Sequence, residues 1–374
     1  MLTKSTFRAG LTSLLALFLV FFVTTPAHAT IDNVVATIAV GDEPWSVAIT
    51  PDGSKALVAI SNASRVDVID TATNTVQTSI TVSGSPTDIA INPLGTYAYV
   101  SKNTGDAVAV IRLSDLTVVA NVTVGSAPLG VTVSPDSSKI YVANVISNTY
   151  SVIRASDNTV TNTVSTATSP LMVAVSPDGA KLYVTNYAAS SLQVFTTSNN
   201  TLANTISIGA ESRSMAFSPD ASKLYVVNKG PNTVSVVNTA NNAVTDTISV
   251  ASGPMGMAIT PDGAKLYVAC FDTGQVQVID TATKAVISTI NVASGMTGIA
   301  VTPNGRSAYA TSLLNDTVSV INLVEPTPTP TPTPQELAKT GSSSEAGAVL
   351  SVVAIISLFG GALFLRRKNS LSKR

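Results

Sequence analysis

Histidine is almost absent from this chain, and its scarcity excludes several kinds of chemistry. The one histidine among the 374 residues is His28, near the N-terminus. Histidine is the usual general base near neutral pH, a member of Ser-His-Asp triads and a common ligand of zinc. We therefore expect no histidine-dependent catalytic site in the folded part of the chain, and the sequence implies no metal and no cofactor.

Cysteine, charge and aromatic residues are scarce as well. Cys270 is the single cysteine, so no disulfide can form within the chain, and we interpret its thiol as a tolerated substitution rather than a nucleophile. Charged residues make up 11% of the chain, the net charge is −1 and aromatic residues make up 5%. Because nucleic acid binding requires a basic surface, we expect no nucleic acid partner.

What the chain has in abundance is repetition. A tripeptide similar to Pro-Asp-Gly returns every 42 residues, without insertion or deletion. Its first residue is Pro51, Pro93, Pro135, Pro177, Pro219, Pro261 and Pro303. Repeats of this length that consist of short strands and turns are typical of propellers and solenoids.

Each repeat contains four runs of strand length. In the first repeat these are residues 45–50, 55–61, 65–70 and 75–82, all rich in Val, Ile and Thr. Pro51, Asp52 and Gly53 suit the turn between the first two runs, because proline presets φ, aspartate bonds to nearby backbone and glycine accepts positive φ. Four antiparallel strands repeated seven times predict an all-β fold, a seven-bladed β-propeller.

The two ends of the repeat array predict how the ring closes. The last repeat has three strands, at residues 297–302, 306–311 and 317–323, and Pro326 follows soon after. Residues 33–41, before the first repeat, have the pattern of a fourth strand. An unpaired strand edge in the last blade would promote aggregation. We therefore predict that the N-terminal strand completes the last blade.

The second strands carry a resemblance to a known family. They read Ile-Tyr-Val-Ala-Asn at residues 140–144, Leu-Tyr-Val-Thr-Asn at 182–186 and Leu-Tyr-Val-Val-Asn at 224–228. Tyr99, Tyr267 and Tyr309 occupy the same column, and Leu57 is the exception. Over about residues 31–323 the pattern resembles the YVTN-family β-propeller repeat. That resemblance implies a surface or extracellular protein with a binding or architectural role, and it transfers no catalytic residue.

Both ends of the chain carry targeting patterns. Lys4 and Arg8 precede an apolar run and Ala27-His28-Ala29, which is the pattern of a signal peptide cleaved after Ala29. We therefore divide the chain into a signal peptide (residues 1–29), the propeller (30–324), a Pro/Thr-rich stalk (325–336) and an anchoring segment (337–374). Residues 346–365 are apolar and long enough to span a bilayer, and a basic tail follows them.

The anchoring segment resembles the cell-wall sorting signal of Gram-positive bacteria. Its motif is Leu337, Ala338, Lys339, Thr340 and Gly341, with Ala338 where proline is usual. The resemblance implies that a sortase cuts after Thr340 and joins this residue covalently to peptidoglycan, so that residues 346–365 lie in the membrane only before sorting. The alternative is a plain single-pass membrane anchor with the propeller outside the cell.

The loops that join the fourth strand to the first, and the second strand to the third, are predicted to carry the ligand. They share one face, and there the side chains break the repeat. One column after these loops reads Trp45, Thr87, Leu129, Leu171, Arg213, Met255 and Thr297. The candidate ligand residues are Trp45, Asp88, Lys102, Tyr187, Glu211, Arg213, Lys229, Phe271 and Asp272. Tryptophan and arginine are the residues that binding hot spots favour.

Two functions of different classes fit these observations. The first is a binding, adhesion or scaffold module that is displayed on the cell wall and contacts an extracellular protein or glycan. The second is an extracellular propeller hydrolase or lyase with a histidine-free site in the funnel. Because no convergent set of catalytic residues is visible in the sequence, we favour the first and expect no enzyme activity.

Overall fold

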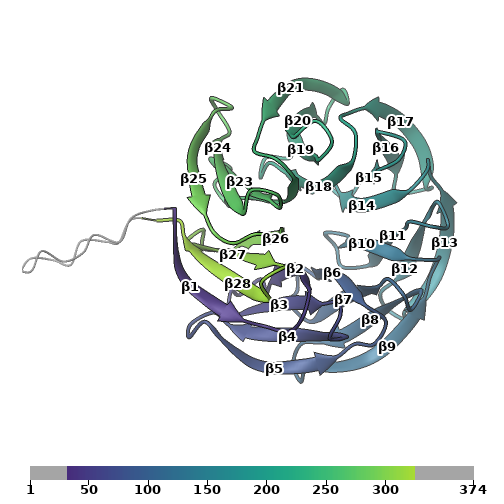
Figure 1. Ribbon diagram of the computed structural model, residues 1–374. Coiled ribbons are helices and arrows are strands. Elements are labelled where there is room, and N and C mark those ends of the chain that lie inside the picture. The colour runs from purple at the N-terminus through teal and green to yellow at the C-terminus, as the bar shows by residue number, and fades with distance from the viewer. Residues whose placement is uncertain (1–31, 325–374) are drawn as a thin grey trace, which may run out of the picture. The chain divides into compact units, whose positions relative to one another are not determined.

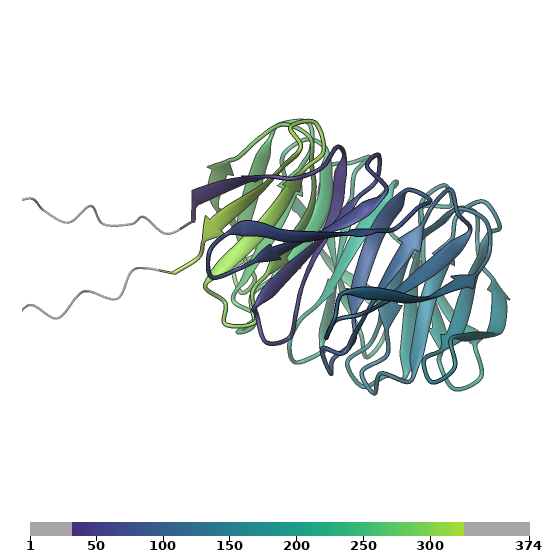
Figure 2. The ribbon, with the colours of Figure 1, turned by 90° about the horizontal axis from the view of Figure 1, so that it is seen from below.

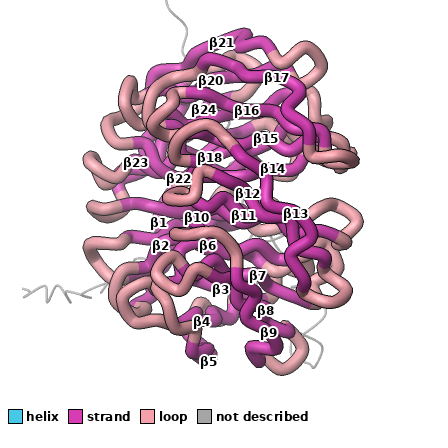
Figure 3. The backbone as a smooth tube through the Cα atoms, turned by 90° about the vertical axis from the view of Figure 1, so that its right-hand side faces the viewer, coloured by secondary structure: helices cyan, strands magenta, loops and turns pink. Residues whose placement is uncertain are grey.

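The computed structural model describes residues 32–324, which form seven four-stranded antiparallel sheets arranged as blades around an axis (Figure 1). The predicted fold class is confirmed. This part of the chain consists of strands and loops, without a helix (Figure 3).

The strands take four positions in each blade. The innermost are β2 (Pro44–Ile49), β6 (Pro86–Ile91), β10 (Pro128–Val133), β14 (Pro170–Val175), β18 (Ser212–Phe217), β22 (Pro254–Ile259) and β26 (Met296–Val301). The second are β3 (Lys55–Ile60), β7 (Tyr97–Lys102), β11 (Lys139–Asn144), β15 (Lys181–Asn186), β19 (Lys223–Asn228), β23 (Lys265–Cys270) and β27 (Ser307–Ser312). The third are β4 (Arg65–Asp70), β8 (Ala107–Arg112), β12 (Thr149–Arg154), β16 (Ser191–Thr196), β20 (Thr233–Asn238), β24 (Gln275–Asp280) and β28 (Thr317–Asn322). The outermost are β5 (Thr75–Thr81), β9 (Thr117–Thr123), β13 (Thr159–Ser165), β17 (Thr201–Ser207), β21 (Ala243–Ser249), β25 (Val286–Asn291) and β1 (Asn33–Ala39).

The strands run between two faces of the ring (Figure 2). The turn face carries the turns from first to second and from third to fourth strand, such as residues 50–54 and 71–74. The loop face carries the other connections, such as residues 61–64 and 82–85. Each turn on the turn face is built by local side chains: Asp52 Oδ1 accepts from Thr50 Oγ1 at 2.5 Å and from the Ser54 amide at 3.0 Å. These hydrogen bonds lower the pKa of Asp52, as expected for a carboxylate that accepts several donors.

The N-terminal strand closes the ring, as predicted. β1 pairs antiparallel with β28, from Asn33 opposite Asn322 to Ala39 opposite Thr317, in the sheet order β1-β28-β27-β26. Asp32 fastens this strand to the sixth blade, because Tyr267 Oη donates to Asp32 Oδ1 at 2.6 Å and Lys265 Nζ lies 3.1 Å from Oδ2. The closure therefore combines a strand ladder with a partly buried polar anchor.

The hydrophobic core lies between the blades. Each of its clusters draws side chains from two adjacent blades, such as Leu57 and Val68 with Ile89 and Val100. The tyrosine column of the second strands is buried within these interfaces. Its hydroxyl groups reach the next blade, where Tyr183 Oη donates to Asn242 Oδ1 at 3.1 Å. The tyrosine that marks the repeat thus links neighbouring blades.

The targeting segments stay predictions. Within residues 32–324, no helix is long and apolar enough to cross a membrane. The expected signal peptide (1–29), stalk (325–336), sorting motif (337–341) and span (346–365) lie outside the described residues.

Candidate functional site

A pocket of about 150 Å³ lies on the axis, among the first residues of the innermost strands. Because these strands start at the loop face, the pocket opens toward that face. Every member of the predicted column lines it: Trp45, Thr87, Leu129, Leu171, Arg213, Met255 and Thr297. Asp88 lines it too, and the only charged residues of this lining are Asp88 and Arg213.

An irregularity in the inner strands shapes the pocket wall. β2 pairs with β3 at Pro44 and again from Val47, so Ser46 lies in a bulge that turns toward the next blade. There Ser46 Oγ accepts the amide of Ile89 at 3.2 Å. Ser214 Oγ accepts the amide of Met257 in the same way, at 3.3 Å. This column therefore supplies an acceptor for an amide of the neighbouring blade.

Three other blades place glycine in the column, at Gly130, Gly256 and Gly298, and there the backbones approach closely. A Cβ atom on Gly298 would lie 2.8 Å from the carbonyl oxygen of Trp45. Glycine therefore allows a contact between blades that any side chain would prevent.

Asp88 is the charged member of this column. Its Oδ1 accepts its neighbour's amide, that of Ile89, at 3.0 Å, and its Oδ2 accepts the amide of Val131 in the third blade at 3.0 Å. Burial raises the pKa of Asp88 to about 6, although these hydrogen bonds and one from Ser46 oppose the rise. The pocket wall thus holds a carboxyl group whose pKa burial raises well above its ordinary value.

Arg213 lies across the ring from Asp88, since β18 faces β2 and β6 over the axis (Figure 1). Its guanidinium carbon is 5.1 Å from the centroid of the Tyr187 ring, a cation–π distance. Burial raises the pKa of the Tyr187 hydroxyl, and a hydrogen bond to Glu211 adds to the rise. Arg213, Tyr187 and Glu211 therefore form one polar cluster beside the pocket.

The remaining candidates are held in separate contacts and do not line the axial pocket. Lys229 Nζ is 5.9 Å from the centroid of the Phe271 ring. Asp272 accepts a hydrogen bond from Ser252 Oγ at 2.9 Å. Lys102 is buried, and its Nζ donates to Asn121 Oδ1 at 2.9 Å. The structure brings together Trp45, Asp88 and Arg213 around the pocket, with Tyr187 and Glu211 beside Arg213.

The backbone of the loop face is more regular than its side chains predict. A residue with positive φ precedes each inner strand, as at Glu43 (φ 61) and Glu211 (φ 57). An Asp or Asn from the preceding blade often binds the amide of this residue: Asp316 Oδ1 accepts from Glu43 at 3.1 Å, and Asn148 Oδ1 from Ser169 at 2.8 Å. The sequence signal was the return of Asp or Asn at positions 106, 148, 232 and 316, which our sequence reasoning missed.

Two other features bear on chemistry. Cys270 is fully buried, and burial raises the pKa of its thiol to about 12, so the thiolate form is suppressed at neutral pH. Among residues 32–324, no three His, Cys, Asp or Glu side chains gather closely enough to hold a metal ion.

Comparisons with known proteins bear on the fold. A family model described as "Lactonase, 7-bladed beta-propeller" matches residues 158–244. No curated protein matches the chain. Among solved structures, Kuenenia stuttgartiensis hydrazine synthase has a TM-score of 0.69 at 21% identity and covers 75% of this chain and 95% of its own. The β-propeller domain of Cps50 (Swd1) from Myceliophteria thermophila has a TM-score of 0.70 at 12% identity, with 78% and 100% covered. At these identities the likeness shows the β-propeller fold alone.

Proposed function

We propose that this protein is a binding module whose axial pocket on the loop face receives one protruding group of a larger extracellular ligand. The observation that carries this proposal is the lining of the pocket. The lining breaks the repeat and combines Trp45, Arg213 and apolar side chains. Its volume of about 150 Å³ is below the roughly 300–1,000 Å³ of most small-molecule sites, so it suits a single side group.

A hydrolase is the second candidate, because of the raised pKa of Asp88 and the description of the matching family model. Asp88 has a pKa raised to about 6, which suits a general base near neutral pH. The matching family model carries the description lactonase. Against this, Asp88 is committed to two backbone amides, and no second carboxylate lines the pocket. Hydrolysis of simple lactones, lost in an Asp88→Ser variant, would favour the hydrolase over the binding module.

The binding module is tested by two truncations in the pocket. Trp45→Ala and Arg213→Ala are each expected to weaken a ligand found in a screen of glycans and matrix proteins by about 1 kcal/mol or more. The melting temperature is expected to change little, because neither side chain belongs to a core cluster. Binding is measured by calorimetric titration, and melting by circular dichroism.

The control for this test lies on the other face. Asp178→Asn and Asp262→Asn change turn residues of the turn face and are expected to leave binding intact. If both pocket variants bind normally, or if only the turn-face variants lose binding, the ligand does not enter the axial pocket.

We also propose that the propeller is displayed outside a Gram-positive cell and joined to its wall. The support is the sequence at both ends: the leader of residues 1–29, the motif Leu337–Gly341 and the apolar run 346–365. The YVTN-like repeat adds to it, since that family is found largely in surface proteins. A single-pass membrane anchor is the alternative arrangement.

Wall attachment is tested at the motif. Thr340→Ala is expected to move the protein from the peptidoglycan fraction to the membrane or the medium, because the sortase reaction would join the carbonyl of Thr340 to the wall. Ser342→Ala, one residue beyond the motif, is the matched control and is expected to leave sorting unchanged. Attachment to peptidoglycan that survives Thr340→Ala would leave the membrane anchor as the better account.

A further inference from the structure

A groove of about 710 Å³ separates the first two blades on the turn face, away from the axial pocket. The corresponding site between the third and fourth blades measures about 250 Å³. Because the backbone repeats from blade to blade, the difference comes from the side chains of these two blades.

The groove exists where the tyrosine column is interrupted. At the other interfaces a buried tyrosine of the second strand extends toward the next blade's turn, as Tyr183 does toward Asn242. In the first blade this position is Leu57, and the residue that corresponds to Asn242 is Leu116. Both members of the pair have changed: Leu57 is fully buried, and Leu116 packs against its cluster. This interface therefore lacks the phenol ring and the hydrogen bond that Tyr183 supplies at its own.

The edge of the groove departs from the repeat as well. Leu94 occupies the turn position held by Asp52 in the first blade, and its side chain is 72% exposed. Leu113 takes the place of a threonine that ties two turns together in four other blades, as Thr197 Oγ1 does by donating to the Gly179 carbonyl at 2.5 Å. Leu94 and Leu113 therefore both line the groove, and Leu113 packs against the core cluster of Leu57, as Leu116 does.

Lys55 also differs in its bonding from two of its counterparts, Lys139 and Lys181. Lys181 Nζ donates to the Thr239 carbonyl of the next blade at 2.6 Å, and Lys139 Nζ to that of Thr197 at 3.3 Å. Lys55, which lines the groove, makes no such bond to the second blade within residues 32–324. Its ammonium group keeps donors for a ligand.

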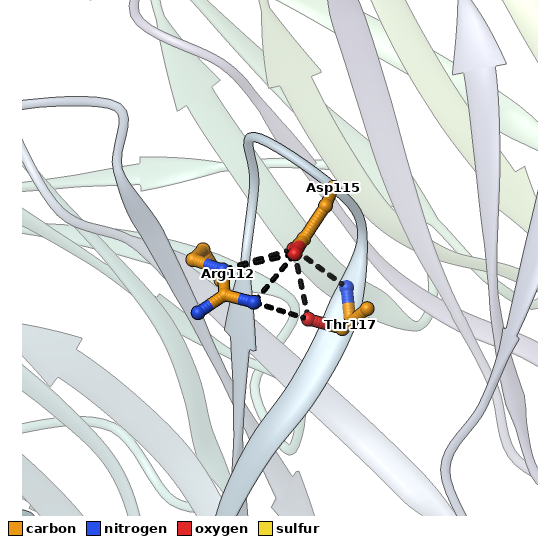
Figure 4. Close-up of polar contacts among 3 residues, drawn as sticks. All are labelled: Arg112, Asp115 and Thr117. Carbon is orange, nitrogen blue, oxygen red and sulfur yellow. Dashed lines mark hydrogen bonds and ion pairs between the residues drawn. The ribbon is translucent and has the colours of Figure 1, made fainter.

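Arg112 is fixed at the groove by a network of its own (Figure 4). Its Nε donates to both carboxylate oxygens of Asp115 at 3.1 Å, and its Nη2 reaches Asp115 and Thr117 Oγ1, the latter at 3.3 Å. These bonds hold the guanidinium plane in place while Nη1 forms none of them. A preorganised planar donor loses little entropy on binding a ligand.

We propose that this groove is a saccharide-binding site. Sugar hydroxyls both donate and accept hydrogen bonds, and the groove offers the donors of Lys55 and Arg112 and the acceptor Asp52. The C–H faces of a sugar ring pack on apolar surface, which Leu94, Leu113 and the Tyr97 ring supply. The volume lies within the range of small-ligand sites.

An extended peptide fits this groove less well. Peptides that add to a propeller blade pair with the free edge of an outer strand. None of the residues that line the groove belongs to β5 or β9, the outer strands of these blades. The polar groups on offer are side chains, which suits discrete hydroxyl groups.

The test is a calorimetric titration of the full-length protein with cellotetraose, chitotetraose and tetragalacturonate. We expect binding of at least one of the three, weakened about tenfold by Arg112→Gln. Arg154→Gln is the matched control, because Arg154 has the same partners in the next blade, with Asp157 at 3.3 Å and Thr159 at 3.1 Å. Its affinity should equal that of the unchanged protein.

A second variant restores the repeat and fills the groove. Leu57→Tyr combined with Leu116→Asn is expected to abolish saccharide binding, and Leu94→Asp serves if the double variant fails to fold. An oligosaccharide that loses affinity in Arg213→Ala but not in Arg112→Gln binds the axial pocket instead, and this outcome would overturn the groove as its site. The proposal is wrong if none of the three oligosaccharides binds, or if binding is unchanged in Arg112→Gln and in the groove-filling variant.

Discussion

Deletion of residues 31–41 is expected to abolish the cooperative unfolding of the propeller. Without β1, the whole length of β28 loses its ladder on one side, and the last blade exposes a strand edge. Tyr267 and Lys265 also lose Asp32, their partner in the partly buried anchor. Differential scanning calorimetry is expected to show a broad or absent transition, and size-exclusion chromatography is expected to show aggregates.

Point variants separate the anchor from the strand. Asp32→Ala is expected to lower the free energy of unfolding by about 1–3 kcal/mol, because it leaves the Tyr267 hydroxyl and the Lys265 ammonium group without their partner in a partly buried site. Val35→Ala is the control in the same strand, since its side chain is 52% exposed. An unchanged melting curve for the deletion variant would disprove closure by this strand.

Stability is expected to fall by about 2 kcal/mol between about pH 4 and pH 7 because of Asp88. The folded pKa of Asp88 is raised to about 6 from 3.8, so folding favours its protonated form. This contribution is fully present below pH 3.8 and is lost as the pH rises through 6. The change is smaller than the difference between 3.8 and 6 alone would give, because Asp88 is only partly buried at the axial pocket and solvent screens its charge. Urea unfolding at each pH measures the change.

The Asp88→Ser variant tests whether Asp88 causes this loss of stability with rising pH. Serine is the native residue of this column at Ser46 and Ser214, where its hydroxyl accepts the neighbouring amide. The variant should keep an acceptor for Val131, unfold at higher urea near pH 7, and lose the pH dependence between pH 4 and 7. The pKa values of Asp136 and Asp220 are lowered to about 2, so the ionisation of these two groups changes stability only at lower pH. A variant that still loses stability over this interval would assign the titration to another group.

The fold could be predicted from the sequence because the same turn and strand patterns recur at a fixed interval. The Pro51 turn and the Val-rich strands recur every 42 residues, and the missing last strand has a visible substitute at residues 33–39. The strand ends in the structure differ by one or two residues from those predicted from the sequence, as in β3, which ends at Ile60 rather than at Ser61. Hydrogen bonding decides these ends, and the sequence pattern does not encode it.

The sites were less predictable, because they depend on contacts between repeats. The column of Trp45 and Arg213 was found, since it directly follows the loops. The groove beside Leu57 was not, because it requires knowing that a second strand meets a turn 59 residues further on, as Tyr183 meets Asn242. The exception Leu57 was noticed in the sequence, but its partner Leu116 became meaningful only in three dimensions.

Ring closure also determines how the molecule carries mechanical load. Asn33 lies opposite Asn322, so the described chain enters and leaves the ring at the same end of one strand pair. A pull on the chain beyond residue 324 acts on β28, which is hydrogen-bonded to β27 on one side and to β1 on the other. Two ladders must then rupture before the strand is extracted, whereas an outermost strand would be held by one. Joining its two ends in one blade thus gives the propeller a reinforced point of attachment.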